Sequence, residues 1–332
     1  MKIVKRIFAG ILVLCMMVSL LAGPGSMWKI RAETFGDFEY EQLPNGSVMI
    51  TKYTGSDAIV TVPKTLDGKA VTQIDDQAFE YCDTLEELVL LDGVTRIGAK
   101  AFSDCTSLLK ISLPDSITRI GDYAFHRCKV LTEVRIPDGV TSILNGTFAG
   151  CFALKEAVIA GSLEKIGDRA FESCTSLTQF HIPDSVTIIG DSAFINCESL
   201  MRIVVPDGVT SIGKSAFFRC KSLEEFSIPD GVHDIKLLTF GMCEKLARVS
   251  LTESVTTIED DAFMQCKSLK DVYYSGTEEK WDEITIGKVN NHYLVNATIH
   301  FSDGSTRNDP EGYEYKILQD DTVEITQCTS YN

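Results

Sequence analysis

Residues Thr118–Val140 read TRIGDYAFHRCKVLTEVRIPDGV, and variants of this stretch follow one another along most of the chain. The Phe of its Ala-Phe-x-x-Cys core recurs every 23 residues without an insertion, and a Cys stands three residues after each Phe. These phenylalanines are Phe79, Phe102, Phe125, Phe148, Phe171, Phe194, Phe217, Phe240 and Phe263. So strict a period predicts a solenoid, in which each coil buries its apolar side against its neighbours because it cannot bury that side alone.

Two short extended segments and a turn are expected in each repeat. Apolar residues alternate at the end of Leu131–Ile136, which predicts a strand, and Val140–Ile143 predicts a second one. Pro137-Asp138-Gly139 between them has the residues of a tight turn. Asp122 is expected to cap a short helical turn that carries the following Ala and Phe inward. Asp or Asn occupies this position in most repeats, but it is replaced at Ala99, Lys214 and Leu237.

Other stretches divide the chain around the array. Residues 1–32 combine a basic start with the apolar run Ile7–Ala22 and are expected to be a secretory signal peptide, with an uncleaved anchor as the alternative. Residues 33–57 are expected to form a lead-in hairpin, 58–272 the array of a half repeat and nine full repeats, and 273–302 a C-terminal cap with Trp281 over the last coil. Residues 303–332 are expected to be a linker and a stub that echoes the lead-in, since Tyr313-Glu314-Tyr315 matches Phe38-Glu39-Tyr40.

The repeat resembles the BspA-type leucine-rich repeats of bacterial surface and secreted proteins. The resemblance covers roughly residues 58–272 and rests on the Ala/Thr-Phe-x-x-Cys and Leu-x-x-apolar-x-apolar positions of nine copies. It implies a leucine-rich-repeat β-solenoid of 23-residue coils, with parallel strands and short helical turns, capped at both ends. The resemblance also implies adhesion or binding at the cell surface. No LPxTG-type sorting motif is present, and the fourth and eighth repeats depart from the turn sequence at Ala160–Ser162 and Thr252–Ser254.

The charge of the chain excludes several partners. The formal net charge is −16. Residues 1–32 hold five basic and no acidic side chains, so the rest of the chain has −16 − 5 = −21. A surface this acidic repels nucleic acid and anionic lipid, so no nucleic acid is expected as a partner, and no membrane beyond the signal peptide. A monomer is expected.

The repeated cysteines are expected to be buried thiols that pack as small apolar side chains. Disulfides between adjacent coils are the alternative, since the separation between coils would allow them, but nine is an odd number and the spacing follows the coil. Zinc is not expected, because no CxxC pair is present. Residues Gly208–Ser215 match the GxxxxGK[ST] phosphate-loop pattern by accident, since a 23-residue coil leaves no room for the long helix of such a loop.

The outward positions of the first strand of each repeat vary while the inward positions repeat, and they are the candidate binding face. From them we select one set of candidate binding residues: Lys110, Glu133, Arg135, Gln179, His181, Arg202, Glu225, Arg248 and Tyr273. Drift on any solvent-facing surface would also produce such variation. No convergent catalytic set is present, so no enzyme activity and no cofactor are expected. The sequence thus predicts a secreted or extracellular binding protein, with association with the cell surface as the other option, whose ligand is a protein or a glycan. A structural spacer in a larger surface protein is the alternative.

Overall fold

The computed structural model describes residues 32–159, 161–307, 313–317 and 323–328. The chain divides into two units, Met1–Ala32 and Glu33–Asn332, and all that follows concerns the second unit. The expected signal peptide lies almost wholly outside the described residues. No described helix has the length and apolar content needed to cross a membrane.

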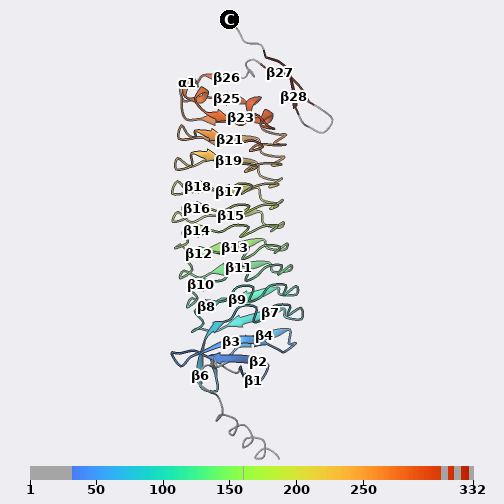
Figure 1. Ribbon diagram of the computed structural model, residues 1–332, viewed down its shortest axis with the longest axis vertical. Coiled ribbons are helices and arrows are strands. Elements are labelled where there is room, and N and C mark those ends of the chain that lie inside the picture. The colour runs from blue at the N-terminus through green and yellow to red at the C-terminus, as the bar shows by residue number, and fades with distance from the viewer. Residues whose placement is uncertain (1–31, 160, 308–312, 318–322, 329–332) are drawn as a thin grey trace, which may run out of the picture. The chain divides into compact units, whose positions relative to one another are not determined.

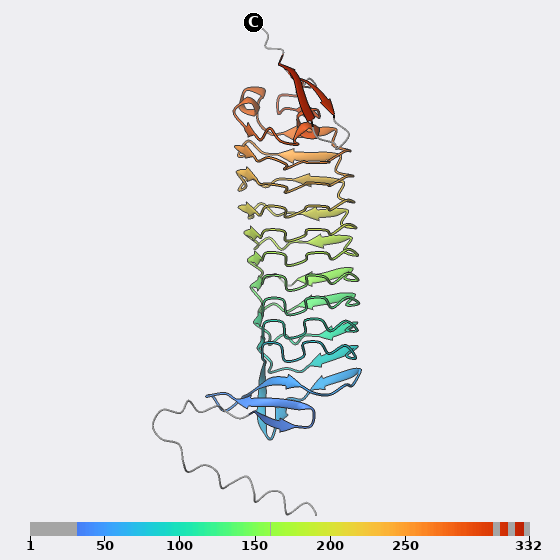
Figure 2. The same ribbon diagram turned by 45° about the vertical axis from the view of Figure 1, so that its right-hand side comes forward.

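The second unit forms a stack of coils, and every full coil contributes two short strands (Figures 1 and 2). Equivalent strands pair in parallel with those one repeat away, as where Glu133–Ile136 pairs with Glu156–Ile159 in register. The first strands are β7 Glu87–Leu90, β9 Lys110–Ser112, β11 Glu133–Ile136, β13 Glu156–Ile159, β15 Gln179–His181, β17 Arg202–Val204, β19 Glu225–Ser227, β21 Arg248–Leu251 and β23 Asp271–Tyr274. The second strands are β8 Arg96–Ile97, β10 Arg119–Ile120, β12 Ser142–Ile143, β14 Lys165–Ile166, β16 Ile188–Ile189, β18 Ser211–Ile212, β20 Asp234–Ile235 and β22 Thr257–Ile258. The predicted solenoid of 23-residue coils is confirmed.

The N-terminal end is closed by a small antiparallel sheet that joins the ladder of the second strands through β6 Lys69–Ile74 and β8. Strands β1 Glu33–Phe35, β2 Phe38–Gln42 and β3 Val48–Tyr53 pair antiparallel, and β3 then pairs in parallel with β6. Strand β4 Ile59–Val62 pairs in parallel with β7, and β5 Thr65–Leu66 folds back on β6. Tyr40, Val48 and Ile50 are fully buried beneath this sheet.

At the other end, the ladders continue past residue 272 through one enlarged coil. Strand β24 Thr285–Ile286 pairs in parallel with β22, and β25 Thr298–His300 pairs in parallel with β23. The offset grows from 23 residues to 28 between Thr257 and Thr285, because α1 Glu278–Asp282 is inserted in this coil. The remaining elements are α2 His292–Val295, β26 Thr306–Arg307, β27 Tyr313–Ile317 and β28 Val323–Cys328. Trp281 is buried and meets the ring of Tyr274 edge-on at 5.4 Å.

In every 23-residue coil the third side is an arc that contains no helix, so the predicted capped helical turn is wrong. Backbone amides point alternately within the coil and toward the next coil: Phe79 N donates to Ala101 O at 2.8 Å, whereas Cys82 N donates to Phe79 O at 3.2 Å. Gln77 and Tyr81 adopt positive φ of 62° and 63°, and Gly146 and Gly150 take these two positions in the fourth coil. Non-glycine residues pay about 1 kcal/mol or more for this conformation, which the hydrogen bonds to the next coil offset.

The side chains of Asp122 and of its Asp or Asn equivalents in other repeats connect neighbouring coils and do not cap a helix. The Asp168 carboxylate accepts a hydrogen bond at 3.0 Å from the backbone amide of Asp191, its equivalent in the next coil. Likewise the Lys214 amide donates to the Asp191 carboxylate and the Asp168 amide donates to Asn145 Oδ1, both at 3.0 Å. Each such side chain therefore joins two coils by satisfying an amide that the turns leave without a backbone partner.

Ala99→Asn should stabilise the protein by about 0.5–1 kcal/mol, the net value of one added hydrogen bond. The Ala99 side chain has no acceptor, and none of the described hydrogen bonds uses the Asp122 amide of the next coil. By contrast, Asn145 at the equivalent position accepts a hydrogen bond from the Asp168 amide of its next coil. Asn is chosen because Asp would add a charge between Asp76 and Asp122. Urea unfolding would measure the change. Asp168→Ala is the matched variant, because it removes the equivalent hydrogen bond and should lower the free energy of unfolding by about 1 kcal/mol. Equal stability of Ala99→Asn and the wild type would contradict this role.

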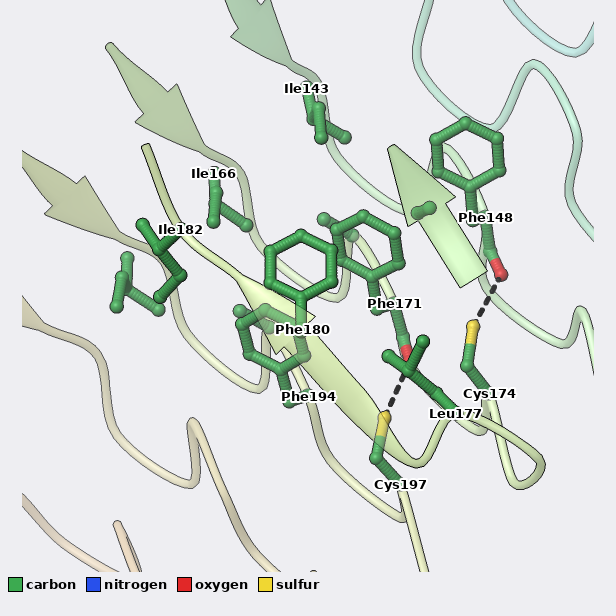
Figure 3. Close-up of a cluster of buried hydrophobic side chains, with 14 of the residues drawn as sticks. Ile143, Phe148, Ile166, Phe171, Cys174, Leu177, Phe180, Ile182, Phe194 and Cys197 are labelled. Carbon is green, nitrogen blue, oxygen red and sulfur yellow. Dashed lines mark hydrogen bonds between the residues drawn. The ribbon is translucent and has the colours of Figure 1, made fainter. Parts of the chain in front are cut away.

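The core is a continuous stack of phenylalanine rings with thiols beside it (Figure 3). From Phe79 to Phe263, rings of adjacent coils lie 5.1–5.8 Å apart between centroids. Phe180 and Phe226 meet these rings at steep angles, as Phe180 does with Phe171 at 4.8 Å. At the N-terminal end the stack finishes on Tyr53, 5.1 Å from Phe79.

Candidate functional site

We use the name strand face for the outward side chains of the first strands, β7 to β23. They form two rows along the stack, because the parallel register places equivalent residues of successive coils side by side, as with Gln179 beside Arg202. One row is Glu87, Lys110, Glu133, Glu156, Gln179, Arg202, Glu225, Arg248 and Asp271. The other row is Val89, Ser112, Arg135, Val158, His181, Val204, Ser227, Ser250 and Tyr273. All nine candidate binding residues predicted from the sequence are exposed on this face.

Three of the nine candidates are held by contacts within the protein. Lys110 pairs with Glu87 of the preceding coil at 3.2 Å, and Arg135 pairs with Asp115 of the preceding turn at 2.8 Å. The Asp115 carboxylate raises the pKa of the Arg135 guanidinium further above its ordinary value. The ring of Tyr273 stacks on that of His300, with centroids 4.5 Å apart. A ligand would have to displace or share these contacts.

The side chains of the remaining six candidates have no hydrogen bond or ion pair to any other described residue; they are those of Glu133, Gln179, His181, Arg202, Glu225 and Arg248. Arg202 lies next to Gln179 in the parallel register, and Arg248 lies between Glu225 and Asp271 without forming an ion pair. Unpaired guanidinium groups on a fixed sheet are ready to form charge-assisted bonds to a carboxylate.

Apolar side chains lie among these polar ones in the middle of the strand face. Val158, Met201 and Val204 are 47%, 45% and 69% exposed. Val204 registers with His181, so the two share the same part of the face. We call Val158, Gln179, His181, Met201, Arg202 and Val204 the central patch. Met201 was missed from the sequence because it precedes the strand, where the alternation of inward and outward residues has not yet begun.

The strand face is nearly neutral in a strongly acidic chain. Its two rows hold four basic residues (Lys110, Arg135, Arg202, Arg248) and five acidic ones (Glu87, Glu133, Glu156, Glu225, Asp271), a balance of −1. The whole chain has a formal charge of −16. Acidic side chains instead line the turn between the two strands, at Asp92, Asp115, Asp138, Asp184, Asp207, Asp230 and Glu253. An acidic ligand would therefore meet less repulsion at the strand face than at the adjoining turns.

The buried thiols of the cysteine row are chemically unreactive. All nine repeated cysteines are free, and all but Cys82 are buried, so the disulfide alternative is wrong for them. Each buried thiol donates to the carbonyl oxygen of a Phe 26 residues earlier, as Cys174 does to Phe148 at 3.3 Å and Cys197 to Phe171 at 3.2 Å (Figure 3). Burial raises the pKa of Cys151 and of Cys197 to about 12. Thiols that stay protonated are poor nucleophiles and poor metal ligands.

One group of Ser, His and Asp side chains lies together on the arc without the geometry of a hydrolase. The Ser103 hydroxyl donates to Asp104 at 3.0 Å and lies 3.4 Å from His126 Nδ1. The Asp104 carboxylate lies nearest to this same ring nitrogen, at 3.8 Å, so it does not orient the ring from the opposite nitrogen as a catalytic triad requires. Ser103 is also buried, and burial lowers the pKa of His126.

Neither the phosphate-loop pattern nor the two hollows described adds a site. Gly213 and its neighbours lie in strand β18 and its flanking turns, and a Cβ on Gly213 would lie 2.4 Å from Asp191 N, so close contact between coils explains this glycine. Hollows of about 450 and 350 Å³ lie beside Tyr53 and Asp260, away from the strand face. Among the described residues, no group of His, Cys, Asp and Glu is arranged to hold a metal ion.

Comparisons with known proteins agree with this architecture. The family described as BspA type leucine rich repeat region matches residues 72–201 and 164–291. A leucine-rich-repeat protein of T. pallidum is 31% identical over 58% of this chain and 91% of its own, with a TM-score of 0.55. One from Bacteroides ovatus is 22% identical over 82% of this chain and 79% of its own, with a TM-score of 0.53. A leucine rich cell surface protein of Faecalibacterium prausnitzii is 26% identical over 77% and 97% of the two chains, with a TM-score of 0.37. A search of curated proteins returns no match.

Proposed function

Because the chain belongs to the family of BspA-type leucine-rich-repeat proteins, we propose that it is a secreted or cell-surface binding protein whose strand face recognises a macromolecular ligand. The family and the fold are those of interaction modules. Secretion is supported by the basic start and apolar run of residues 1–32. The role that fits these features is adhesion to a host or to a neighbouring cell.

The central patch is the observation that carries this proposal. Arg202 is exposed and unpaired, and it is flanked in sequence by the exposed Met201 and separated by one residue from the exposed Val204. Methionine and arginine are both enriched at protein interfaces, and arginine is among the residues that contribute most of the binding energy. The solenoid holds them on a rigid sheet, so little entropy is lost on binding. A protein ligand with a carboxylate beside an apolar group fits this surface best, and a glycan is the other class that the experiment covers.

Charge reversal at Arg202 and Arg248 should weaken ligand binding by about 100-fold if each arginine contributes about 1.4 kcal/mol or more. The assay is a pull-down of matrix proteins and glycans, followed by titration of any ligand retained. Arg119→Glu with Lys165→Glu is the matched control, since it makes the same change in charge on the second strands β10 and β14. The control should bind within about threefold of wild type. Binding that survives reversal of Arg202 and Arg248, or a wild type that retains no ligand, would count against the strand face.

A structural spacer between other modules is the second candidate. One observation favours it: hairpin β27–β28 repeats the hairpin β2–β3 with which the array starts.

A further inference from the structure

The hairpin of β27 and β28 copies the N-terminal hairpin of β2 and β3 residue by residue. Phe38 pairs with Tyr53 and Gln42 with Val48, while Tyr313 pairs with Cys328 and Ile317 with Val323, so every position is shifted by 275 residues. Both strand pairs change register at the same place, between Glu39 and Tyr40 in one and between Glu314 and Tyr315 in the other. Ordinary hairpin pairing does not require such an irregularity, so its repetition identifies the same module.

The first copy has a definite structural role, because it is the template on which the array starts. The outer edge of β3 pairs in parallel with β6, with Val48 beside Val71 and Ile50 beside Ile74. Two further backbone bonds attach it to the first arc, from Asp75 N to Ile50 O at 2.8 Å and from Tyr53 N to Ala78 O at 2.7 Å. Without this hairpin, β6 would be an open edge above the apolar end of the ring stack.

The second copy keeps the residue types that this role needs. Tyr315, Val323 and Ile325 stand at the positions of Tyr40, Val48 and Ile50, the three side chains that are fully buried in the first copy. Changes fall mainly at less buried positions, such as Lys316 for Glu41 and Glu324 for Met49. Among the apolar positions that are buried in the first copy, the one departure is Cys328 at the position of Tyr53, whose ring ends the phenylalanine stack.

In the part of the chain that the structure describes, β28 pairs with β27 alone, so the edge that corresponds to the docking edge of β3 has no strand on it. We propose that β27–β28 is a second starter cap, and that this edge of β28 accepts, in parallel, the opening strand of a leucine-rich-repeat array of the same kind. The pairing of β3 with β6 defines the partner: a strand with apolar residues three apart, as Val71 and Ile74 are. This property is independent of the strand face and of any ligand bound there.

The test transplants the second hairpin into the position of the first within the full chain. Residues 38–53 are replaced by the sequence of 313–328, with Cys328 changed to Tyr so that the ring stack keeps its end. A matched control carries Asp in place of the transplanted Val323 and Ile325. Hydrogen exchange at β6 and at the following coils is followed by mass spectrometry. The transplant should protect the β6 amides to within about tenfold of wild type, and the control should expose them by more than about 100-fold.

The proposal would be overturned if the β6 amides of the transplant exchange as fast as those of the control. Continued protection of the coils from β11 onward would show that this loss is local. Total unfolding of the transplant would equally count against the proposal. A self-association of the wild-type chain that Ile325→Asp abolishes would also overturn it, because the edge would then pair with another copy of itself and not with an opening strand.

Discussion

Between pH 8.5 and about 10.5 the protein should unfold in one steep transition, driven by its buried thiols. Eight of the repeated cysteines are buried and free, and the thiol of each donates a hydrogen bond to a Phe carbonyl oxygen. A thiolate in such a site would lose both water and that hydrogen bond. Burial accordingly raises the pKa of Cys151 and Cys197 to about 12 and that of Cys128 and Cys174 well above its ordinary value.

The direction of the effect follows from which state holds the protons. In the unfolded chain the thiols ionise near pH 8.5, whereas in the fold they stay protonated. Below that pH both states are protonated, so the stability is fully present. Above it, only the unfolded state releases protons, so each thiol lowers the free energy of unfolding by about 1.4 kcal/mol per pH unit until its folded pKa is reached. Eight thiols together give about 11 kcal/mol per pH unit, comparable to the whole stability of a typical domain, about 5–15 kcal/mol.

Circular dichroism at fixed ionic strength, with a reducing agent present, would locate the transition. Urea unfolding at pH 8.5, 9.0 and 9.5 would give the slope. The matched variant is Cys174→Ser with Cys197→Ser, because a hydroxyl can still donate to Phe148 and Phe171 but does not ionise. Its slope should fall by about 2 kcal/mol per pH unit over this range, in which the thiols of the unfolded chain go from about half to about nine-tenths ionised. A slope that the two serines leave unchanged would assign alkaline unfolding to other groups.

The core of this fold was predictable because it is periodic. A Phe and a Cys recur at one spacing, as at Phe171 and Cys174. A stack of coils buries every copy of both side chains at once, so the spacing predicts the stack. The strands followed from the same reasoning, since the alternation of Val134 and Ile136 with Glu133 and Arg135 sets which side faces inward.

The arc and the pairing of side chains were not predictable, because both depend on contacts between coils. Asp168 precedes an apolar pair just as a helix cap would, yet its hydrogen-bond partner is the amide of Asp191, one coil away. Arg169 at positive φ has no local preference for that conformation, and the stack imposes it. Likewise the alternation showed that Arg135 and Arg202 point outward. Only the packed turns show that Asp115 pairs with Arg135, whereas no described side chain pairs with Arg202.

Phe171→Ala should destabilise the protein by about 3–5 kcal/mol, the second large effect expected. The ring is fully buried between those of Phe148 and Phe194, at 5.5 and 5.3 Å, and Phe180 meets it edge-on at 4.8 Å. The neighbouring coils are fixed by their ladders at the spacing of a ring, so they cannot close on the space that Ala leaves. Urea unfolding should show a midpoint lower by on the order of 1 M. Phe152→Ala is the control, since that ring is 42% exposed and its loss should change the stability by about 0.5 kcal/mol or less.

Coupling between rings tests whether the stack acts as a continuous unit. Phe148→Ala and Phe171→Ala remove the two members of one contact, so their effects should fall short of additivity by about 0.5–1.5 kcal/mol, the value of an aromatic pair. Phe148→Ala and Phe217→Ala remove rings that lie three coils apart, and their effects should add within about 0.5 kcal/mol if unfolding remains a single transition. Equal additivity in the two pairs would show that the rings stabilise the coils only by filling space, with no contribution from ring-to-ring contact.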